Sequence, residues 1–360
     1  MTRHHAHRTG MASAEAVFAA LDLGTNNCRM LAGVQTRTGF RVVDSFSRIV
    51  RLGEGLQSTG RLADKAMDRA IEALHACASR LARRPIRAVR AIATEACRQA
   101  INGPAFLDRV RAETGFPFTI ISAREEALLA LESCAPLLDP TARRALLFDI
   151  GGGSTELAWV RLDTPGRRPD LIGTATLPAG VITLSERHAI EGPGPSPISP
   201  GFDAPSFDAM VDEVRDHLAA FERTHRIGRE VQQGGVQLLG TSGTVTTLAG
   251  VALNLARYRR PLIDGTTLSA AAGDAALALL RDLGREGLRQ HPCVGPDRVD
   301  FVLPGCAVFQ AIRDTWPMAE VTVADRGLRE GMILKMIQSS TPTRSAQGRP
   351  MASAPTAYPA

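Results

Sequence analysis

The chain has 360 residues, of which 44% are hydrophobic and 22% are charged, and its formal net charge is +5. This composition excludes a wholly disordered chain and allows two globular domains. The charge is too small for a protein that wraps nucleic acid, although it suits an anionic ligand. No apolar run reaches the roughly 18 residues of a membrane span, and the six cysteines form no C-x-x-C pair. We therefore expect a cytoplasmic protein with neither a nucleic-acid nor a membrane partner.

Both ends of the chain are small, polar and Pro-rich, and we expect residues 1–15 and 339–360 to be disordered. Between them, residues 16–141 and 142–338 are predicted to form two α/β domains. The elements expected in the first domain are the strands "VFAALDL", "CRMLAGVQ" and "RVVDSFSRIV", a helix over 63–83, the strand "AVRAIAT", a short helix from Glu95, a helix opened by Pro104, the strand "FTII", and a helix from Ser122 to about Cys134.

The second domain is expected to open with the strand "ALLFDI", a triple-glycine turn and the strand "ELAWVRL". A Pro/Gly-rich surface loop over 190–205 follows. The remaining elements are a helix over 206–226, the strand "VQLLGT", the helix "TVTTLAGVALNLA", helices near 270–283 and 305–315, the strand "EVTVAD" and the helix "GLREGMILKMIQ". Each domain thus begins with a strand, an aspartate, a glycine-containing turn and a second strand. The order strand, turn, strand excludes dinucleotide-binding and Walker loops, in which the glycines lie between a strand and a helix.

The triple-glycine turn "DIGGGSTE" has the composition of an anion-binding loop. A hairpin here would place Asp149 opposite Glu156, at the roughly 4.5–5.5 Å of cross-strand neighbours. Two carboxylates at that distance require a bridging cation or a shared proton, and Mg²⁺ or Mn²⁺ would supply the cation. Backbone amides and hydroxyl groups would bind phosphate through Gly151, Gly152, Gly153, Ser154 and Thr155. The alternative is an ordinary tight hairpin with its own turn hydrogen bonds.

A second turn, "DLGTNN", repeats the pattern with Asp22, Gly24, Thr25 and Asn26. Two such turns favour a pair of loops that face one cleft over two unrelated hairpins. The later sequence "GTSGT" (240–244) follows an apolar strand and opens a helix, so Gly243 is a candidate for a further anion contact at a helix N-terminus. A small-residue turn that permits close packing is an equal alternative there.

These segments resemble a known family. "LDLGTNNCRML" and "FDIGGGSTEL" resemble the phosphate-1 and phosphate-2 loops of the actin/Hsp70/sugar-kinase superfamily, and the chain resembles its exopolyphosphatase/guanosine pentaphosphate phosphatase (Ppx/GppA) branch from about residue 17 to 338. Further matches are "RLGEGL", "ATEACRQA", "IISAREEA", "LLGTSGTVTTLAG" and "VADRGLREG". The resemblance implies an α/β fold of two actin-like (ribonuclease H-like) domains with an interdomain active-site cleft. It also implies that the final helix returns to pack on the first domain.

The acidic pair in "IISAREEA" contains the candidate general base. Ser122 and Glu125 have the S-x-x-E spacing of a capping box, which gives Glu125 a structural role. Glu126 has no such role, although an acid there would also interact favourably with the helix dipole. The resemblance points to the second glutamate of the pair as the base, so we expect Glu126 to deprotonate a water for attack on the terminal phosphorus.

Arg98 matches a family arginine that contacts substrate phosphate, so the resemblance implies this role; a solvated helix arginine is the alternative. The residues before it, Thr94-Glu95-Ala96, depart from the family's usual Thr-Ser-Ala, and an extra acid there could alter phosphate affinity. The ordered part of the chain is expected to end near 338, without the C-terminal helical extension of long members. If that extension holds long polyphosphate, we expect a preference for shorter chains or pentaphosphate nucleotides.

The sequence therefore predicts a hydrolase that releases terminal orthophosphate from inorganic polyphosphate, with Mg²⁺ or Mn²⁺ held by Asp149, Glu156 and Asp22. The nearest alternative is a 5′-phosphatase of guanosine pentaphosphate (pppGpp). A kinase and a non-hydrolysing polyphosphate or nucleotide sensor of the same superfamily are less favoured, because Glu126 is placed to activate water. We also expect a homodimer.

Overall fold

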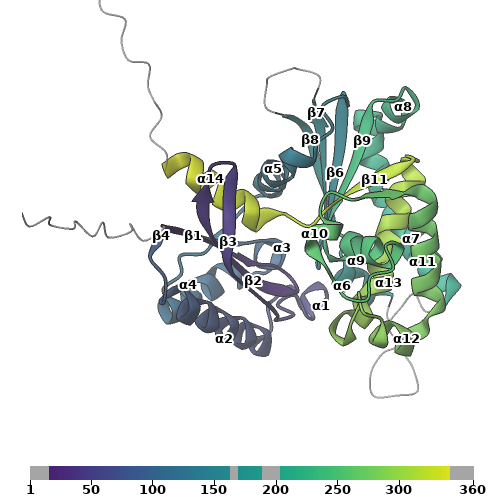
Figure 1. Cartoon of the computed structure of the whole chain (residues 1–360). Helices are drawn as coiled ribbons and strands as arrows, with labels where there is room; N and C mark the ends of the chain where they lie inside the picture. The colour runs from purple at the N-terminus through teal and green to yellow at the C-terminus, as the bar shows by residue number, and fades with distance from the viewer. Residues whose placement is uncertain (1–15, 163–168, 189–202, 341–360) are drawn as a thin grey trace, which may run out of the picture.

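The computed structural model describes residues 16–162, 169–188 and 203–340. It has two lobes, each built around a mixed β-sheet (Figure 1). Of the segments expected to be irregular, residues 1–15, 190–202 and 341–360 lie outside the described residues, whereas residues 339–340 and 204–205 belong to helices. None of the helices in the described ranges is long and apolar enough to cross a membrane.

The first lobe contains a five-stranded sheet in the order β3-β2-β1-β4-β5. Its first three strands form an antiparallel meander, and β4 and β5 continue the sheet in parallel with β1. β1 is buried along both faces, as expected for a strand covered by helices on both sides. The strands are β1 Val17–Leu23, β2 Asn27–Thr36, β3 Gly39–Ile49, β4 Ile86–Ala93 and β5 Thr119–Ile120.

The second lobe contains a six-stranded sheet in the order β10-β11-β9-β6-β7-β8. β6 and β7 form the antiparallel hairpin that corresponds to β1 and β2 of the first sheet, and β9 pairs in parallel with β6 as β4 does with β1. The two halves therefore share one topology at their centres. The strands are β6 Arg144–Ile150, β7 Thr155–Arg161, β8 Asp170–Leu177, β9 Val236–Thr241, β10 Thr267–Ser269 and β11 Glu320–Ala324.

Helices cover both faces of each sheet. The helices are α1 Leu56–Thr59, α2 Asp64–Leu81, α3 Glu95–Gln99, α4 Gly103–Thr114, α5 Ala123–Cys134, α6 Val181–Arg187, α7 Ala204–His225, α8 Ile227–Gln232, α9 Gly243–Ala252, α10 Arg260–Ile263, α11 Ala270–Asp282, α12 Gly284–Gln290, α13 Val299–Thr315 and α14 Leu328–Ser340, with 3-10 turns at Ala135–Leu137 and Pro296–Arg298.

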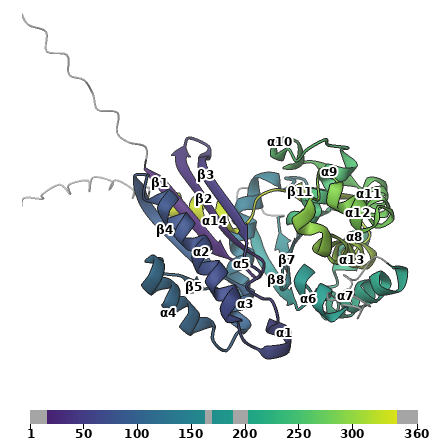
Figure 2. The same ribbon diagram turned by 90° about the horizontal axis from the view of Figure 1, so that it is seen from below.

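Two helices cross between the lobes. α14 leaves the second sheet and packs its Met332 and Ile333 on Phe18 of β1, on the face opposite α2 (Figures 1 and 2). α5 leaves the first sheet and joins the apolar cluster on one face of the second. The two helices meet at Gly331, where a Cβ atom would lie 2.1 Å from the carbonyl oxygen of Leu129, so only glycine permits this approach. The crossing places the glycine turns of both sheets at one cleft.

Several elements were not predicted from the sequence, namely β8, β10, α1, α6, α8, α10 and α12, and α13 begins earlier than expected. β8 was not predicted, because Gly173 and its small polar neighbours weaken the strand pattern of "DLIGTATL". α13 begins at Val299 rather than near 305, with Pro304 inside the helix. Proline is normally a helix breaker. Here Val302, Leu303 and Pro304 are all buried, so core packing sustains the helix through the proline.

Candidate active site

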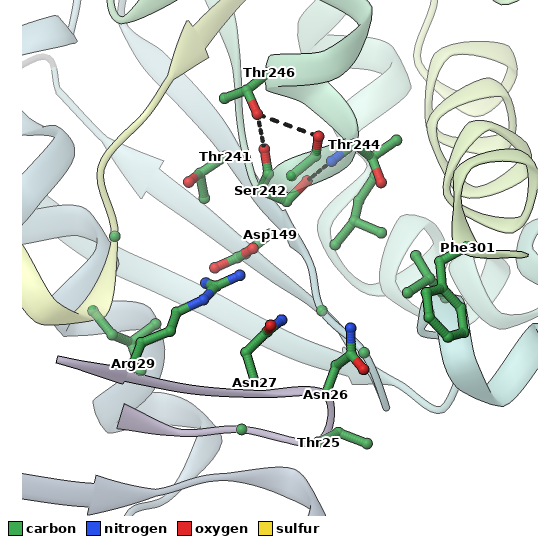
Figure 3. Close-up of a pocket in the computed structure, with 18 of the residues that line it drawn as sticks. Thr25, Asn26, Asn27, Arg29, Asp149, Thr241, Ser242, Thr244, Thr246 and Phe301 are labelled. Carbon is green, nitrogen blue, oxygen red and sulfur yellow. Dashed lines mark hydrogen bonds between the residues drawn. The ribbon is translucent and has the colours of Figure 1, made fainter. Parts of the chain in front are cut away.

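A cavity of about 420 Å³ lies between the lobes. Its walls come from the β1–β2 turn, the β6–β7 turn, the start of α9, the start of α13 and the start of α14. Figure 3 shows side chains from these elements converging on the same space. Of the residues that the sequence singled out, those in the cavity lining are Asp22, Gly24, Thr25, Asn26, Glu126, Asp149, Gly151, Gly152, Gly153, Ser154, Glu156 and Gly243.

The two glycine turns touch each other. Each is closed by one backbone hydrogen bond, from Gly24 N–H to the Asn27 carbonyl (3.0 Å) and from Gly151 N–H to the Ser154 carbonyl (2.9 Å). A Cβ atom on Gly152 would lie 3.2 Å from the backbone nitrogen of Asn26, and one on Gly153 would lie 2.7 Å from Thr25 Oγ1. A side chain on Gly153 would collide with the other turn, and one on Gly152 would be crowded by it.

The carbonyl groups of the triple-glycine turn point away from the cavity. The start of α6 binds them, with Val181 N–H donating to Gly151 O (3.0 Å) and Ile182 N–H donating to Gly152 O (2.8 Å). Because the carbonyl and N–H of one planar trans peptide point in opposite directions, the N–H groups that follow these carbonyls face the other side. Those of Gly152 and Gly153 have no acceptor among the described residues. The turn therefore presents amide donors, as an anion-binding nest does.

Two predicted phosphate-binding residues do not line the cavity. Thr155 is fully buried, and its hydroxyl donates to the Ala179 carbonyl (2.6 Å), because alternation along β7 turns it away from the neighbouring Ser154. The guanidinium of Arg98 is held behind the cavity wall. Its Nε and Nη2 donate to Glu95, and its Nη1 donates to the Ile121 carbonyl (2.8 Å) and to Glu126 Oε2 (3.4 Å).

The two acids of the triple-glycine hairpin are direct cross-strand neighbours, Asp149 opposite Glu156. Burial raises the pKa of Asp149 to about 6. Burial, together with the nearby charges of Glu126 and Asp149, holds the pKa of Glu156 well above its usual range. Ser154 donates a hydrogen bond to Glu156 and stabilises its charged form only partly. Carboxylates crowded into one cavity form a strong site for a cation or a proton.

Glu126 is buried at the first turn of α5, with its carboxylate at the cavity. Burial raises its pKa to about 8, against the opposing effect of Arg98, and the charges of Asp22 and Asp149 raise it further. Ser122 caps the helix by accepting from the Glu125 N–H (3.2 Å). The side chain of Glu125 is paired with Arg90 rather than with the Ser122 amide that a full capping box would use. The two adjacent glutamates thus have separate roles.

Sequence reasoning missed Arg29, which lines the cavity from β2. It is the cross-strand neighbour of Asp22, and its side chain points toward Asp149 (Figure 3). Its positive charge lowers the pKa of both Asp22 and Asp149 against the larger effect of burial. A signal was present, because a lone arginine in the apolar strand "CRMLAGV" is costly to bury unless an acid lies nearby.

The far end of the cavity is built around the N-terminus of α9. Ser242 caps this helix by accepting from the N–H groups of Thr244 and Val245, with an unusual backbone φ of 124°. A Cβ atom on Gly243 would lie 3.5 Å from Arg298 Nη1. Phe301 also lines this end (Figure 3). An arginine and an aromatic ring therefore line the same cavity as the N-terminus of α9.

The donor set fits a hard divalent cation that also binds substrate. Within the described ranges, no group of three or more His, Cys, Asp or Glu side chains is arranged to hold a metal ion by itself. Two carboxylates, Asp149 and Glu156, suffice for Mg²⁺, which keeps water and substrate phosphate as its other ligands. Asp22 lies in the same cavity, but Arg29 and Arg329 already offset its charge.

We expect kcat/KM for the hydrolysis that the sequence predicts to rise with pH from about 6 to about 8. A general base acts only when deprotonated, and the pKa of Glu126 in the free protein is about 8. Below that value each pH unit should cost about tenfold in rate, with a plateau above it. Initial rates at constant ionic strength from about pH 6 to about pH 9 measure this profile. A flat profile over this range would contradict the assignment of Glu126.

Comparison with known proteins gives consistent matches over most of the chain. The model of the Ppx/GppA phosphatase family matches residues 32–340. A Haemophilus influenzae protein named "Putative exopolyphosphatase" is 29% identical over 321 residues, which are 88% of this chain and 90% of that protein. A guanosine-5′-triphosphate,3′-diphosphate pyrophosphatase of Photobacterium profundum is 28% identical over 89% of this chain, but this chain spans only 59% of its length. The crystal structure of an exopolyphosphatase-like protein is 26% identical, with a TM-score of 0.77 over 90% of this chain and 98% of that chain.

Proposed function

The chain belongs to the Ppx/GppA phosphatase family, and from this premise we propose that it releases terminal orthophosphate from inorganic polyphosphate by attack of an activated water. Phosphatases of this family act on phosphoanhydride bonds. The structural matches confirm the predicted fold of two actin-like domains. The substrate and the roles of the residues are our proposal.

One observation carries the proposal: a buried carboxylate, Glu126, shares one cavity with two glycine turns that touch each other. The amides of Gly152 and Gly153, with the β1–β2 turn across from them, would bind the oxygens of the terminal phosphate. Glu126 would accept the proton of a water aligned with the terminal phosphorus, and its raised pKa makes it a stronger base than an exposed glutamate. Arg29 would offset the negative charge of Asp22 and Asp149 in the cavity. Positioning and charge neutralisation would supply most of the catalysis.

Asp149 and Glu156 would hold Mg²⁺ or Mn²⁺, with Asp22 as a further candidate. Such an ion, when bound, neutralises phosphate charge and orients the chain end. The two carboxylates would then remain charged at neutral pH despite their burial, because a cation favours the charged form. Ser154 would keep Glu156 in place through its hydrogen bond.

A 5′-phosphatase acting on pppGpp is the second candidate. The observation that favours it is the far end of the cavity, where Phe301, Tyr258 and Arg298 adjoin the start of α9. An aromatic ring and an arginine can hold a nucleobase and a second phosphate group. The triphosphate end would occupy the same turns, so the chemistry at Glu126 is the same for both substrates.

Phosphate release by the purified protein tests the proposal. With Mg²⁺ present, we expect orthophosphate from inorganic triphosphate and longer polyphosphate, and its loss when EDTA is added. A higher kcat/KM for pppGpp than for triphosphate would select the second candidate. Absence of phosphate release from every one of these compounds would contradict both and favour a sensor; transfer of phosphate to an acceptor other than water would favour a kinase.

A further inference from the structure

One acid in the cavity wall has no part in the proposed reaction. Glu95 opens α3, directly after β4, and its side chain is buried, with a residue exposure of 8%. It lines the cavity, whereas its ion-pair partner Arg98 is not among the lining residues. We propose that the carboxylate of Glu95 competes with a substrate phosphate for the guanidinium of Arg98 and thereby lowers the protein's affinity for polyphosphate. This inference rests on the proposed function of the cavity as a phosphate site.

The guanidinium of Arg98 is almost fully engaged. Its Nε donates to Glu95 Oε2 (2.9 Å), and its Nη2 donates to the same oxygen. Its Nη1 donates to the Ile121 carbonyl (2.8 Å) and approaches Glu126 Oε2 (3.4 Å). An arginine has five N–H donors, so these contacts leave one of them. Bidentate binding of a phosphate needs two parallel donors.

The carboxylate of Glu95 is itself fixed. Its other oxygen, Oε1, accepts from Gln99 Nε2 one turn later on the same helix. Because both oxygens are bound and the side chain is buried, the carboxylate is held against Arg98 beside the cavity, which Glu95 lines and Arg98 does not. A phosphate can gain the Nε and Nη2 donors only by displacing Glu95. The guanidinium of Arg98 can therefore bind either Glu95 or a substrate phosphate through these donors, but not both at once.

A consequence is that removing the charge of Glu95 should strengthen phosphate binding. Glu95→Gln keeps the size of the side chain and its contact with Gln99 but weakens the bond to Arg98, since charge-assisted hydrogen bonds are about twice as strong as neutral ones. The change also removes one negative charge from a cavity that must accept a polyanion. These two effects are separable, because only the first requires Arg98.

A double-mutant cycle tests the proposal by the dissociation constant of inorganic triphosphate, measured by calorimetry in EDTA so that no turnover is needed. We expect Glu95→Gln to lower this constant about tenfold, and the same change in an Arg98→Ala background to alter it by less than about twofold. Glu113→Gln is the matched control, because it breaks a Glu–Arg pair on the exposed face of α4 and should leave binding unchanged.

An unchanged or weaker affinity in Glu95→Gln would overturn the proposal, since it would mean that Glu95 orients Arg98 rather than competing for it. Equal tightening in both backgrounds would also overturn it, because the effect would then be the general charge of the cavity. The readout is independent of catalysis. A protein that binds triphosphate but releases no orthophosphate would refute the proposed reaction and leave this test intact.

Discussion

Replacing Glu126 by glutamine is expected to lower kcat for phosphate release about 1000-fold while changing KM by less than about threefold. Glutamine keeps the shape of the side chain and can still accept from Arg98, but it cannot take a proton from water. The cavity is otherwise unchanged, so substrate binding at the glycine turns should persist. Steady-state kinetics on inorganic triphosphate with saturating Mg²⁺ separate the two constants.

Glu125→Gln is the matched control for this variant. It makes the same chemical change at the adjacent residue, whose side chain is paired with Arg90 outside the cavity lining. We expect this protein to keep its full kcat. A Glu126→Gln protein with wild-type kcat would remove Glu126 as the general base, and a rise in KM alone would make it a binding residue.

Replacing Asp149 by asparagine is expected to lower the rate about 100-fold at fixed Mg²⁺, with partial recovery as Mg²⁺ is raised. Asparagine keeps one oxygen ligand but loses the charge that attracts the ion, and it leaves Glu156 as the single carboxylate of the hairpin. The half-saturating Mg²⁺ concentration should therefore increase. Titration of the rate with Mg²⁺ measures this shift.

Asp68→Asn is the control here, because Asp68 forms an exposed ion pair with Arg109 on the first lobe. This variant should show the wild-type Mg²⁺ dependence. If Asp149→Asn also kept that dependence, Asp149 would not be a ligand of the ion, and its burial opposite Glu156 would need another explanation.

Many strands and both glycine-containing hairpins could be predicted from the sequence, because the patterns that indicate them are local. The pattern of apolar residues predicted most strands, and the spacing of glycines after Asp22 and Asp149 predicted two equivalent hairpins. The register of Asp149 and Glu156 followed from the length of the turn between them. These features depend only on residues close together along the chain.

The residues that the sequence misjudged depend on contacts between distant segments. Arg98 was expected at the phosphate, but it is not among the cavity-lining residues, and it is bound by Glu95 three residues before it as well as by Ile121 and Glu126 of later segments. Arg29 could be assigned only once β2 was known to face Asp149 across the cleft (Figure 3). Strand alternation turns Thr155 away from Ser154, and its hydroxyl is satisfied by the Ala179 carbonyl, which lies 24 positions later. No local pattern encodes such encounters.

Hydrolysis of inorganic triphosphate in ¹⁸O-enriched water tests the central claim most directly. If water activated by Glu126 attacks the terminal phosphorus, the orthophosphate released first carries the ¹⁸O and the remaining pyrophosphate carries none. Mass spectrometry of both products at low conversion distinguishes them. Label in the pyrophosphate, or orthophosphate without label, would contradict the account.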